Sequence, residues 1–289
     1  MHNQKLCFGI NPCFNAPQTE QIKTLKKTGF EGYFIDDCRK DQPVAELVKA
    51  GRDEGLILQS YHAPFNKSDD MWTQGEIGEI ALAEQLECLE ICAKHEIPIM
   101  VTHAFIGYDD DFVSVETGIE RYGKVAKRAG ELGVKFALEN TEGQEFLAIL
   151  MDALKSEKSV GFCWDTGHEL CYNYSEDMTA LYGDRLICTH INDNLGISDF
   201  GGVRTYLDDL HLLPFDGVTD WDSVAKRLVR CGYNDFLTFE LSTTSKRGRF
   251  DNHKYSELPF EIYASEAYAR ACRVATLKLK YEREAKQNV

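Results

Sequence analysis

Eight short hydrophobic runs, separated by longer segments with helical periodicity, restrict this 289-residue chain to few architectures. The runs are Leu6–Ile10, Gly32–Ile35, Leu56–Tyr61, Ile97–Thr102, Val134–Leu138, Val160–Trp164, Leu186–Thr189 and Phe236–Phe239. Because most of them are almost continuously apolar, they are typical of parallel strands that are buried on both faces. Between the runs, Glu76–Lys94 predicts an amphipathic helix, and Ser114 is expected to begin another helix that Gly130 and Gly133 end.

Eight strand–helix units can form an open doubly wound sheet or close into a (β/α)8 barrel. An open nucleotide-binding sheet usually carries a glycine-rich phosphate loop after its first strand. Neither G-x-G-x-x-G nor G-x-x-x-x-G-K-[ST] occurs in this sequence. We therefore predict an α/β protein in which residues 1–289 form one (β/α)8 TIM barrel domain, with a closing helix at Glu261–Ala285 on its outside.

Charge and cysteine usage narrow the classes of function. The 32 Lys and Arg residues against 47 Asp and Glu give a net charge of −15, which disfavours nucleic acid as a partner. No apolar run is long enough to span a membrane, and Met1–Phe14 lacks the apolar core of a signal peptide. The ten cysteines include no Cys-x-x-Cys pair, so we expect reduced thiols in a cytoplasmic protein, with Cys163 and Cys188 as small core residues.

Polar residues follow six consecutive runs at the point where each strand is expected to end. They are His62, His103, Glu139, Asp165, His190 and Glu240. Three more chemically capable side chains lie in the loops beyond, namely His168, Asp209 and His211. Because barrel enzymes place their chemistry at the carboxyl ends of the strands, these side chains are expected to converge.

Any one of these residues could be a hydrogen-bonded structural group, but together they predict a metal site. Burying Glu139, Asp165 and Glu240 side by side would cost several kcal/mol through repulsion and desolvation. A divalent cation removes that cost. Mixed imidazole and carboxylate ligands suit Zn²⁺, Mn²⁺, Co²⁺ or Fe²⁺ better than Ca²⁺.

Three phrases make the chain resemble the xylose isomerase-like (β/α)8 superfamily, which includes ketose 3-epimerases, sugar isomerases and zinc-dependent apurinic-site endonucleases. The phrases are Trp164-Asp165-Thr166-Gly167-His168, His190-Ile191-Asn192-Asp193 and His211-Leu212-Leu213-Pro214-Phe215-Asp216-Gly217. The last is similar to the superfamily's His-x-x-Pro-Gly-x-Gly segment, with Phe215 where the first Gly is more usual.

The epimerase branch implies one divalent cation (Zn, Mn, Co, Fe or Mg) held by Glu139, Asp165, His190 and Glu240. In that branch Glu139 and Glu240 would also serve as catalytic acid and base, and His168 would contact the substrate. The implied substrate is a small ketose, polyol-derived sugar or keto-inositol. Proton transfer beside a metal-bound carbonyl is chemistry that such a set can perform.

The endonuclease branch implies three zinc ions and a phosphodiester substrate. All nine of its ligand types occur here in order, which adds five residues to the four above as additional metal or substrate contacts: His62, His103, His168, Asp209 and His211. Hydrolysis is therefore the alternative to isomerisation, and the number of metal ions stays open between one and three. The net negative charge favours the sugar enzyme.

Other features have two readings each. Arg247 and Arg249, after the eighth strand, could bind an anionic group or belong to a solvated loop. Met71 and Trp72 could form an apolar wall against a sugar ring or anchor a tucked-in loop. Barrels of this kind often form dimers or tetramers, so a homo-oligomer is a further expectation by analogy.

Overall fold

The computed structural model describes residues 3–36 and 41–287, which contain eight parallel strands. The strands are β1 (Leu6–Ile10), β2 (Gly32–Asp36), β3 (Ile57–His62), β4 (Ile99–His103), β5 (Lys135–Glu139), β6 (Val160–Asp165), β7 (Leu186–His190) and β8 (Leu237–Phe239). They pair in the order β7-β6-β5-β4-β3-β2-β1-β8. Each strand lies within two residues of its predicted run, and the (β/α)8 prediction is confirmed.

The barrel closes between β7 and β8 just beyond the regular strands. Ile191 forms a parallel bridge with Phe239, and its N–H donates to the carbonyl oxygen of Thr238 at 2.7 Å. The N–H of Glu240 donates back to the carbonyl oxygen of Ile191 at 3.3 Å. This short seam places the residues after β7 and β8 next to each other.

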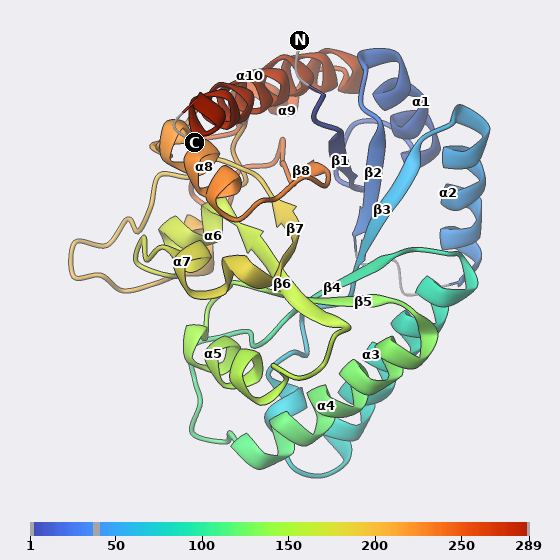
Figure 1. Ribbon diagram of the computed structural model, residues 1–289, viewed down its shortest axis with the longest axis vertical. Coiled ribbons are helices and arrows are strands. Elements are labelled where there is room, and N and C mark those ends of the chain that lie inside the picture. The colour runs from blue at the N-terminus through green and yellow to red at the C-terminus, as the bar shows by residue number, and fades with distance from the viewer. Residues whose placement is uncertain (1–2, 37–40, 288–289) are drawn as a thin grey trace.

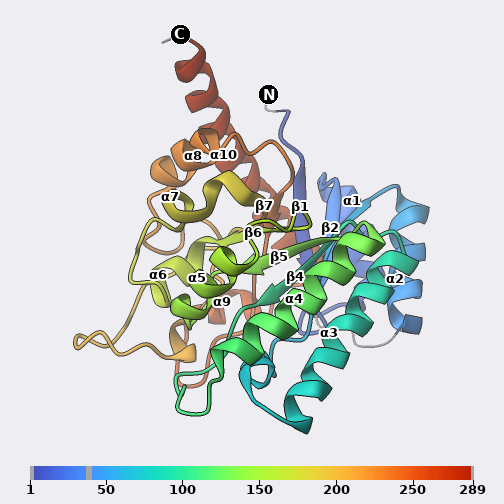
Figure 2. The same cartoon turned by 60° about the horizontal axis from the view of Figure 1, so that its bottom comes forward.

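Helices surround the strands on the outside of the barrel (Figure 1). The α-helices are α1 (Gln18–Thr28), α2 (Asp41–Glu54), α3 (Glu76–Lys94), α4 (Val115–Leu132), α5 (Gln144–Ala153), α6 (Thr166–Cys171), α7 (Met178–Tyr182), α8 (Trp221–Arg230), α9 (His253–Ser256) and α10 (Phe260–Gln287). The described residues also form three short 3-10 helices: η1 (Asp70–Trp72), η2 (Gly183–Arg185) and η3 (Tyr206–Asp208). Figure 2 shows the last turns of α10 extending beyond the barrel.

The predicted helix boundaries hold with one correction. The helix predicted over Glu76–Lys94 is α3, and α10 contains the predicted closing helix. Ser114 precedes α4 as expected, but Gly130 lies inside that helix and only Gly133 ends it. Gly133 adopts the left-handed conformation, with φ of 72°, that favours glycine at helix ends.

Of the three apolar clusters in the described residues, two bear on the position of the strand ends. The larger one fills the space between the strands and the helices and includes Phe8, Phe136 and Phe162. The smaller one lies inside the barrel and consists of Ile99, Val101, Ala137, Cys163 and Cys188. Because side chains alternate along a strand, these interior residues and the strand-end residues point the same way.

The cysteines of the described chain carry no disulfide, as predicted. Nine of them, including the buried Cys163 and Cys188, form no disulfide, and Cys38 lies outside the described residues. No helix in the part of the chain that the structure describes has the length and apolar character needed to cross a membrane.

Candidate metal centre

Five of the six predicted strand-end residues are the last residues of their strands. They are His62 on β3, His103 on β4, Glu139 on β5, Asp165 on β6 and His190 on β7, and Glu240 directly follows β8. The parallel register pairs His103 with Glu139, and Asp165 with His190. The carboxyl end of the barrel therefore gathers all six side chains.

Glu139, Asp165, His190 and Glu240 form the first donor group, whose ligand atoms all lie within 4.8 Å of one another. Nδ1 of His190 lies 2.9 Å from Oε1 of Glu139 and 3.1 Å from Oε2 of Glu240. Glu139, Asp165 and His190 are fully buried, whereas 18% of the Glu240 side chain is exposed. Glu240 is thus the member of the group that faces the open mouth.

The other five predicted residues complete two further donor groups. The second group is His62, His103 and Glu139, in which Oε2 of Glu139 lies 3.1 Å from Nε2 of His62 and 3.6 Å from Nε2 of His103. It shares Glu139 with the first group.

His168, Asp209 and His211 form the third donor group. Oδ1 of Asp209 lies 3.3 Å from Nε2 of His168 and 2.9 Å from Nε2 of His211. His168 belongs to α6, directly after the Asp165 strand end, while Asp209 and His211 follow η3. The structure therefore brings together all nine residues that the sequence singled out.

The two histidines beside Glu139 have opposite protonation tendencies. Burial opposes a charge on His62, but the hydrogen bond to Glu139 and its negative charge outweigh burial and raise the pKa of His62 to about 9. Burial dominates at His103, where the charge of Glu139 offsets it only in part, and lowers its pKa to about 3. His103 is therefore a neutral imidazole, the form that binds metals.

The pKa values of Asp165 and Glu240 also shift in opposite directions. Burial raises the pKa of Asp165 to about 6. Burial acts in the same direction on Glu240, but the charges of His190 and His211 outweigh it and lower the pKa of Glu240 to about 2. Glu240 is thus ionised at neutral pH.

The donor chemistry of the first group fits a divalent cation. Within residues 3–36 and 41–287, every ion-pair partner of Glu139, Asp165 and Glu240 is an imidazole. Buried carboxylates ordinarily need a guanidinium, an ammonium or a metal ion to offset their desolvation. Three carboxylates and one imidazole within 4.8 Å supply suitable ligands for Zn²⁺, Mn²⁺, Co²⁺, Fe²⁺ or Mg²⁺.

Two asparagines that the sequence analysis did not assign hold Asp165 in place. Nδ2 of Asn192 donates to Oδ2 of Asp165 at 2.7 Å, and the N–H of His168 donates to Oδ1 at 2.6 Å. Asn140 accepts from the N–H of Asp165 at 2.8 Å and donates to its carbonyl oxygen at 2.9 Å. The signal in the sequence is an Asn one or two residues after a strand-end ligand, as in Glu139-Asn140. Such partners orient ligands.

The basic residues near the mouth are largely paired with acids. Lys246 lies 3.0 Å from Oδ2 of Asp209, and Arg249 contacts Asp208 at 2.6 Å and Asp251 at 2.7 Å. Arg247 is exposed. The anion-binding role of Arg247 and Arg249 stays a prediction, and for Arg249 it would compete with these ion pairs.

Two large apolar side chains, Met71 and Trp72, anchor the segment that contains η1. Met71 and Trp72 are fully buried, and Nε1 of Trp72 donates to the carbonyl oxygen of Ala104 at 2.8 Å. Of the two readings of these residues, the tucked-in anchor is confirmed and the wall against a sugar ring is not.

Phe215, the residue that departs from the family segment, takes a left-handed backbone conformation with φ of 73°. Its N–H donates to Oδ2 of Asp193 at 2.8 Å, and its ring packs 5.3 Å from that of Trp221. Nε1 of Trp221 donates to the same Asp193 oxygen at 3.2 Å. The buried carboxylate of Asp193 thus fixes the shape of this loop.

Comparison with known proteins places this geometry in context. A family model described as "Xylose isomerase-like TIM barrel" matches residues 22–259. An uncharacterised protein, y4fM of Sinorhizobium fredii, is 33% identical over 231 residues, which cover 75% of this chain and 68% of that protein. A probable endonuclease 4 of Methanoculleus marisnigri is 30% identical over 145 residues, 42% of this chain and 50% of that protein.

Similar solved structures include the apo form of the 3-keto-D-glucoside 4-epimerase YcjR from E. coli. It superimposes with a TM-score of 0.69 at 18% identity and covers 93% of this chain and 100% of that one. At this identity the likeness concerns the fold.

Proposed function

Because this chain belongs to the xylose isomerase-like TIM-barrel family, whose members are enzymes, we propose that it is a metal-dependent isomerase or epimerase of a small sugar-like substrate. The substrate class is a ketose, a polyol-derived sugar or a keto-inositol. Glu139, Asp165, His190 and Glu240 would hold the cation. A divalent cation bound there would acidify the C–H next to a carbonyl group by acting as a Lewis acid.

The observation that supports this reaction is the position of the two glutamates. Glu139 and Glu240 come from β5 and from the end of β8, and both lie within about 3 Å of the same nitrogen of His190. Glu240 is ionised and partly exposed at the mouth, so it is the better placed of the two to take a proton from substrate. Glu139 would return a proton to the opposite face of the same carbon.

The charge around the mouth supports a small, uncharged substrate. Duplex DNA binding depends on Lys and Arg that neutralise phosphates. Lys246 and Arg249, which lie beside the third donor group, already pair with Asp209, Asp208 and Asp251. The net charge of −15 adds to this repulsion.

The test is proton exchange with solvent. The metal-loaded chain is incubated in deuterated water with ketoses and keto-inositols, and deuterium at the carbon next to the carbonyl is measured by NMR. We expect uptake with the native chain and none with Glu139→Gln or Glu240→Gln. If no substrate of the panel takes up label with the native chain, proton transfer is the wrong reaction.

A second candidate, a three-metal phosphodiester hydrolase, rests on a separate observation. The nine donors fall into three adjacent groups, of which the first two share Glu139, and three groups would suit three bound ions. Part of the chain also matches a probable endonuclease 4. Three metal ions per chain by elemental analysis, with incision of an abasic duplex at low salt, would favour this candidate. One ion per chain without incision would exclude it.

A further inference from the structure

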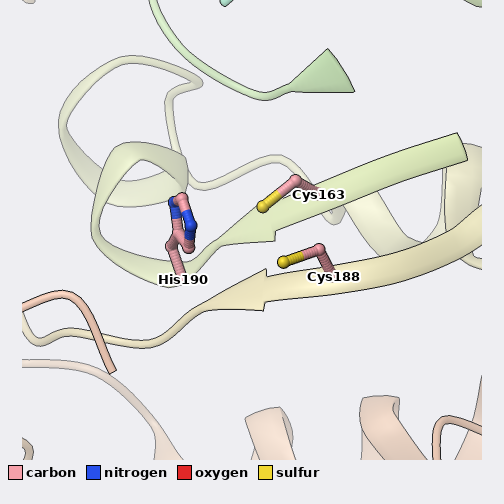
Figure 3. A group of neighbouring side chains, drawn as sticks. All are labelled: Cys163, Cys188 and His190. Carbon is pink, nitrogen blue, oxygen red and sulfur yellow. The ribbon is translucent and has the colours of Figure 1, made fainter. Parts of the chain in front are cut away.

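Two thiols lie directly beneath the first donor group, inside the barrel. Cys163 on β6 and Cys188 on β7 are paired in the parallel register, and both are fully buried. Each lies two residues before a predicted ligand, Asp165 and His190 respectively, so it points into the same interior. Figure 3 shows both sulfur atoms directed toward the imidazole of His190.

The imidazole of His190 has one nitrogen left for these thiols. Nδ1 faces the carboxylates of Glu139 and Glu240. Nε2 is buried and has no hydrogen-bond partner. A buried polar atom without a partner is unfavourable, so this nitrogen is available to a ligand.

Size and charge define the ligand. The sulfur atoms of Cys163 and Cys188 and a nitrogen of His190 all lie within 4.8 Å of one another. Two sulfur ligands, each about 2.3 Å from one ion, are at most about 4.6 Å apart, so only a small adjustment closes the site. Two thiolates neutralise a divalent cation, and thiolates prefer Zn²⁺ and other thiophilic ions to Mg²⁺, Ca²⁺ or Mn²⁺.

A cavity lies at the opposite end of the barrel from the donor groups. This cavity of about 370 Å³ is lined by Ile57 and Lys135, which begin β3 and β5, and by Gln59. Nε2 of Gln59 lies 3.5 Å from Sγ of Cys188 and donates a hydrogen bond to it. The side chain of Gln59 thus separates the cavity from the thiol pair and can also stabilise a bound thiolate.

We infer that Cys163, Cys188 and His190 form a second cation site, which takes a thiophilic divalent ion of the zinc and cadmium class. As each metal–sulfur bond forms, the thiol releases its proton to solvent, and His190, whose Nδ1 would bind the ion of the first site, releases its N–H proton as Nε2 binds, so three protons leave for each cation bound. His190 belongs to both sites through its two nitrogens, so the two ions would be linked by one ring. The inference holds whichever reaction the barrel mouth catalyses.

The test follows thiolate-to-cadmium charge transfer in the near ultraviolet. The full chain carries Cys13→Ala, because Cys13 is exposed. This chain is loaded with Mg²⁺ and is then titrated with Cd²⁺. We expect a charge-transfer band that saturates at one cadmium per chain, with release of three protons. Oxygen and imidazole ligands alone give no such band, so its absence would overturn the inference.

Variants assign the band to its ligands. Cys163→Ala and Cys188→Ala should each abolish it, whereas Cys92→Ala, which removes a buried thiol on α3, should leave it intact. A band that survives in both test variants, or that disappears with Cys92→Ala, would place the site elsewhere. If a test variant unfolds, X-ray absorption at the cadmium edge of the native chain decides: two sulfur neighbours support the site, and a shell of only oxygen and nitrogen refutes it.

Discussion

Glu139 and Glu169 are both buried carboxylates at the same end of the barrel, yet their surroundings differ in kind. Glu169, on α6, is held by the guanidinium of Arg227 at 2.7 and 2.5 Å and accepts from Nε1 of Trp164 at 3.0 Å. Glu139 contacts only imidazoles among its charged partners in the described chain, namely His62, His103, His168 and His190.

This difference in charged partners is what we expect between a structural carboxylate, Glu169, and a proposed metal ligand, Glu139. A guanidinium offers fixed donors that satisfy a carboxylate permanently and stay charged at every accessible pH. An imidazole can lose its proton and bind a cation together with the carboxylate. We therefore expect partners that can be deprotonated at the proposed metal centre, and partners that cannot be deprotonated around structural carboxylates.

The largest expected effect is the loss of metal and activity in Glu139→Gln. Removing a group that merely orients a ligand costs 10- to 100-fold, so removal of this shared ligand should lower metal affinity and turnover by more than about 100-fold. Glu169→Gln should keep its metal content. Elemental analysis and the deuterium-uptake assay measure both quantities. Equal metal loss in two folded variants would show that the two carboxylates do not differ in this way.

Stability should respond in the opposite order. Glu169→Gln removes the buried, two-contact partner of Arg227 and leaves it only the partly exposed Asp177, and breaking such a buried pair lowers the free energy of unfolding by about 3 kcal/mol. The exposed pair between Glu90 and Arg128, 2.6 Å apart, provides the control. Glu90→Gln should cost less than about 1 kcal/mol. Urea denaturation of both variants tests this, and a loss at Glu169 no larger than at Glu90 would contradict it.

Metal removal should affect one region only. A cation at 100 times its dissociation constant stabilises the folded chain by about 2.7 kcal/mol, so chelation should lower the free energy of unfolding by that amount. Glu139→Gln should not respond to the chelator, whereas Glu169→Gln should respond like the native chain. Thermal unfolding with and without chelator makes the comparison, and a response in Glu139→Gln would argue against its role as a ligand.

The smallest effect concerns pH in the scaffold region, where Arg227 also contacts Asp177 at 2.9 Å. Partial burial opposes ionisation of Asp177, but hydrogen bonds from Thr179 and Arg230 outweigh it and lower its pKa from 3.8 to about 2. A lowered pKa contributes stability above pH 3.8 that is lost as the pH falls toward 2.

The native chain should therefore exceed Asp177→Asn in unfolding free energy at pH 5 by at most about 1 kcal/mol, because the side chain is partly exposed. This difference should shrink at pH 3. Urea denaturation at both pH values measures it. A difference that grows at low pH would show that Asp177 is not stabilised as the carboxylate.

The barrel and the six strand-end donors could be predicted from the sequence because both depend on local pattern, whereas the full set of nine came from the family resemblance. Apolar runs define strands, and a side chain that ends a strand, such as His62 or Glu139, must lie at the carboxyl end of the barrel. Gly130 was misread because glycine inside a helix is tolerated where its surroundings stabilise the helix, so its presence alone does not mark an end.

Pairings over long sequence distances were beyond such reasoning. Nothing local indicates that Arg249 contacts Asp208, 41 residues away, or that Trp72 donates to Ala104. The opposition of Cys163 and Cys188 likewise depends on the register of β6 against β7, which contains an irregularity between Phe162 and Cys163. Apolar patterns alone did not specify that offset.

The seam of the barrel has a consequence for its durability. β8 has only three residues, and its link to β7 continues through the single bridge between Ile191 and Phe239. His190 and Glu240 adjoin that bridge, one on each side of the seam. Any fluctuation that separates β7 from β8 must also separate two proposed ligands of one ion. A bound cation would therefore cross-link these two strands where their pairing is shortest. After loss of the cation, we expect the barrel to open first between β7 and β8.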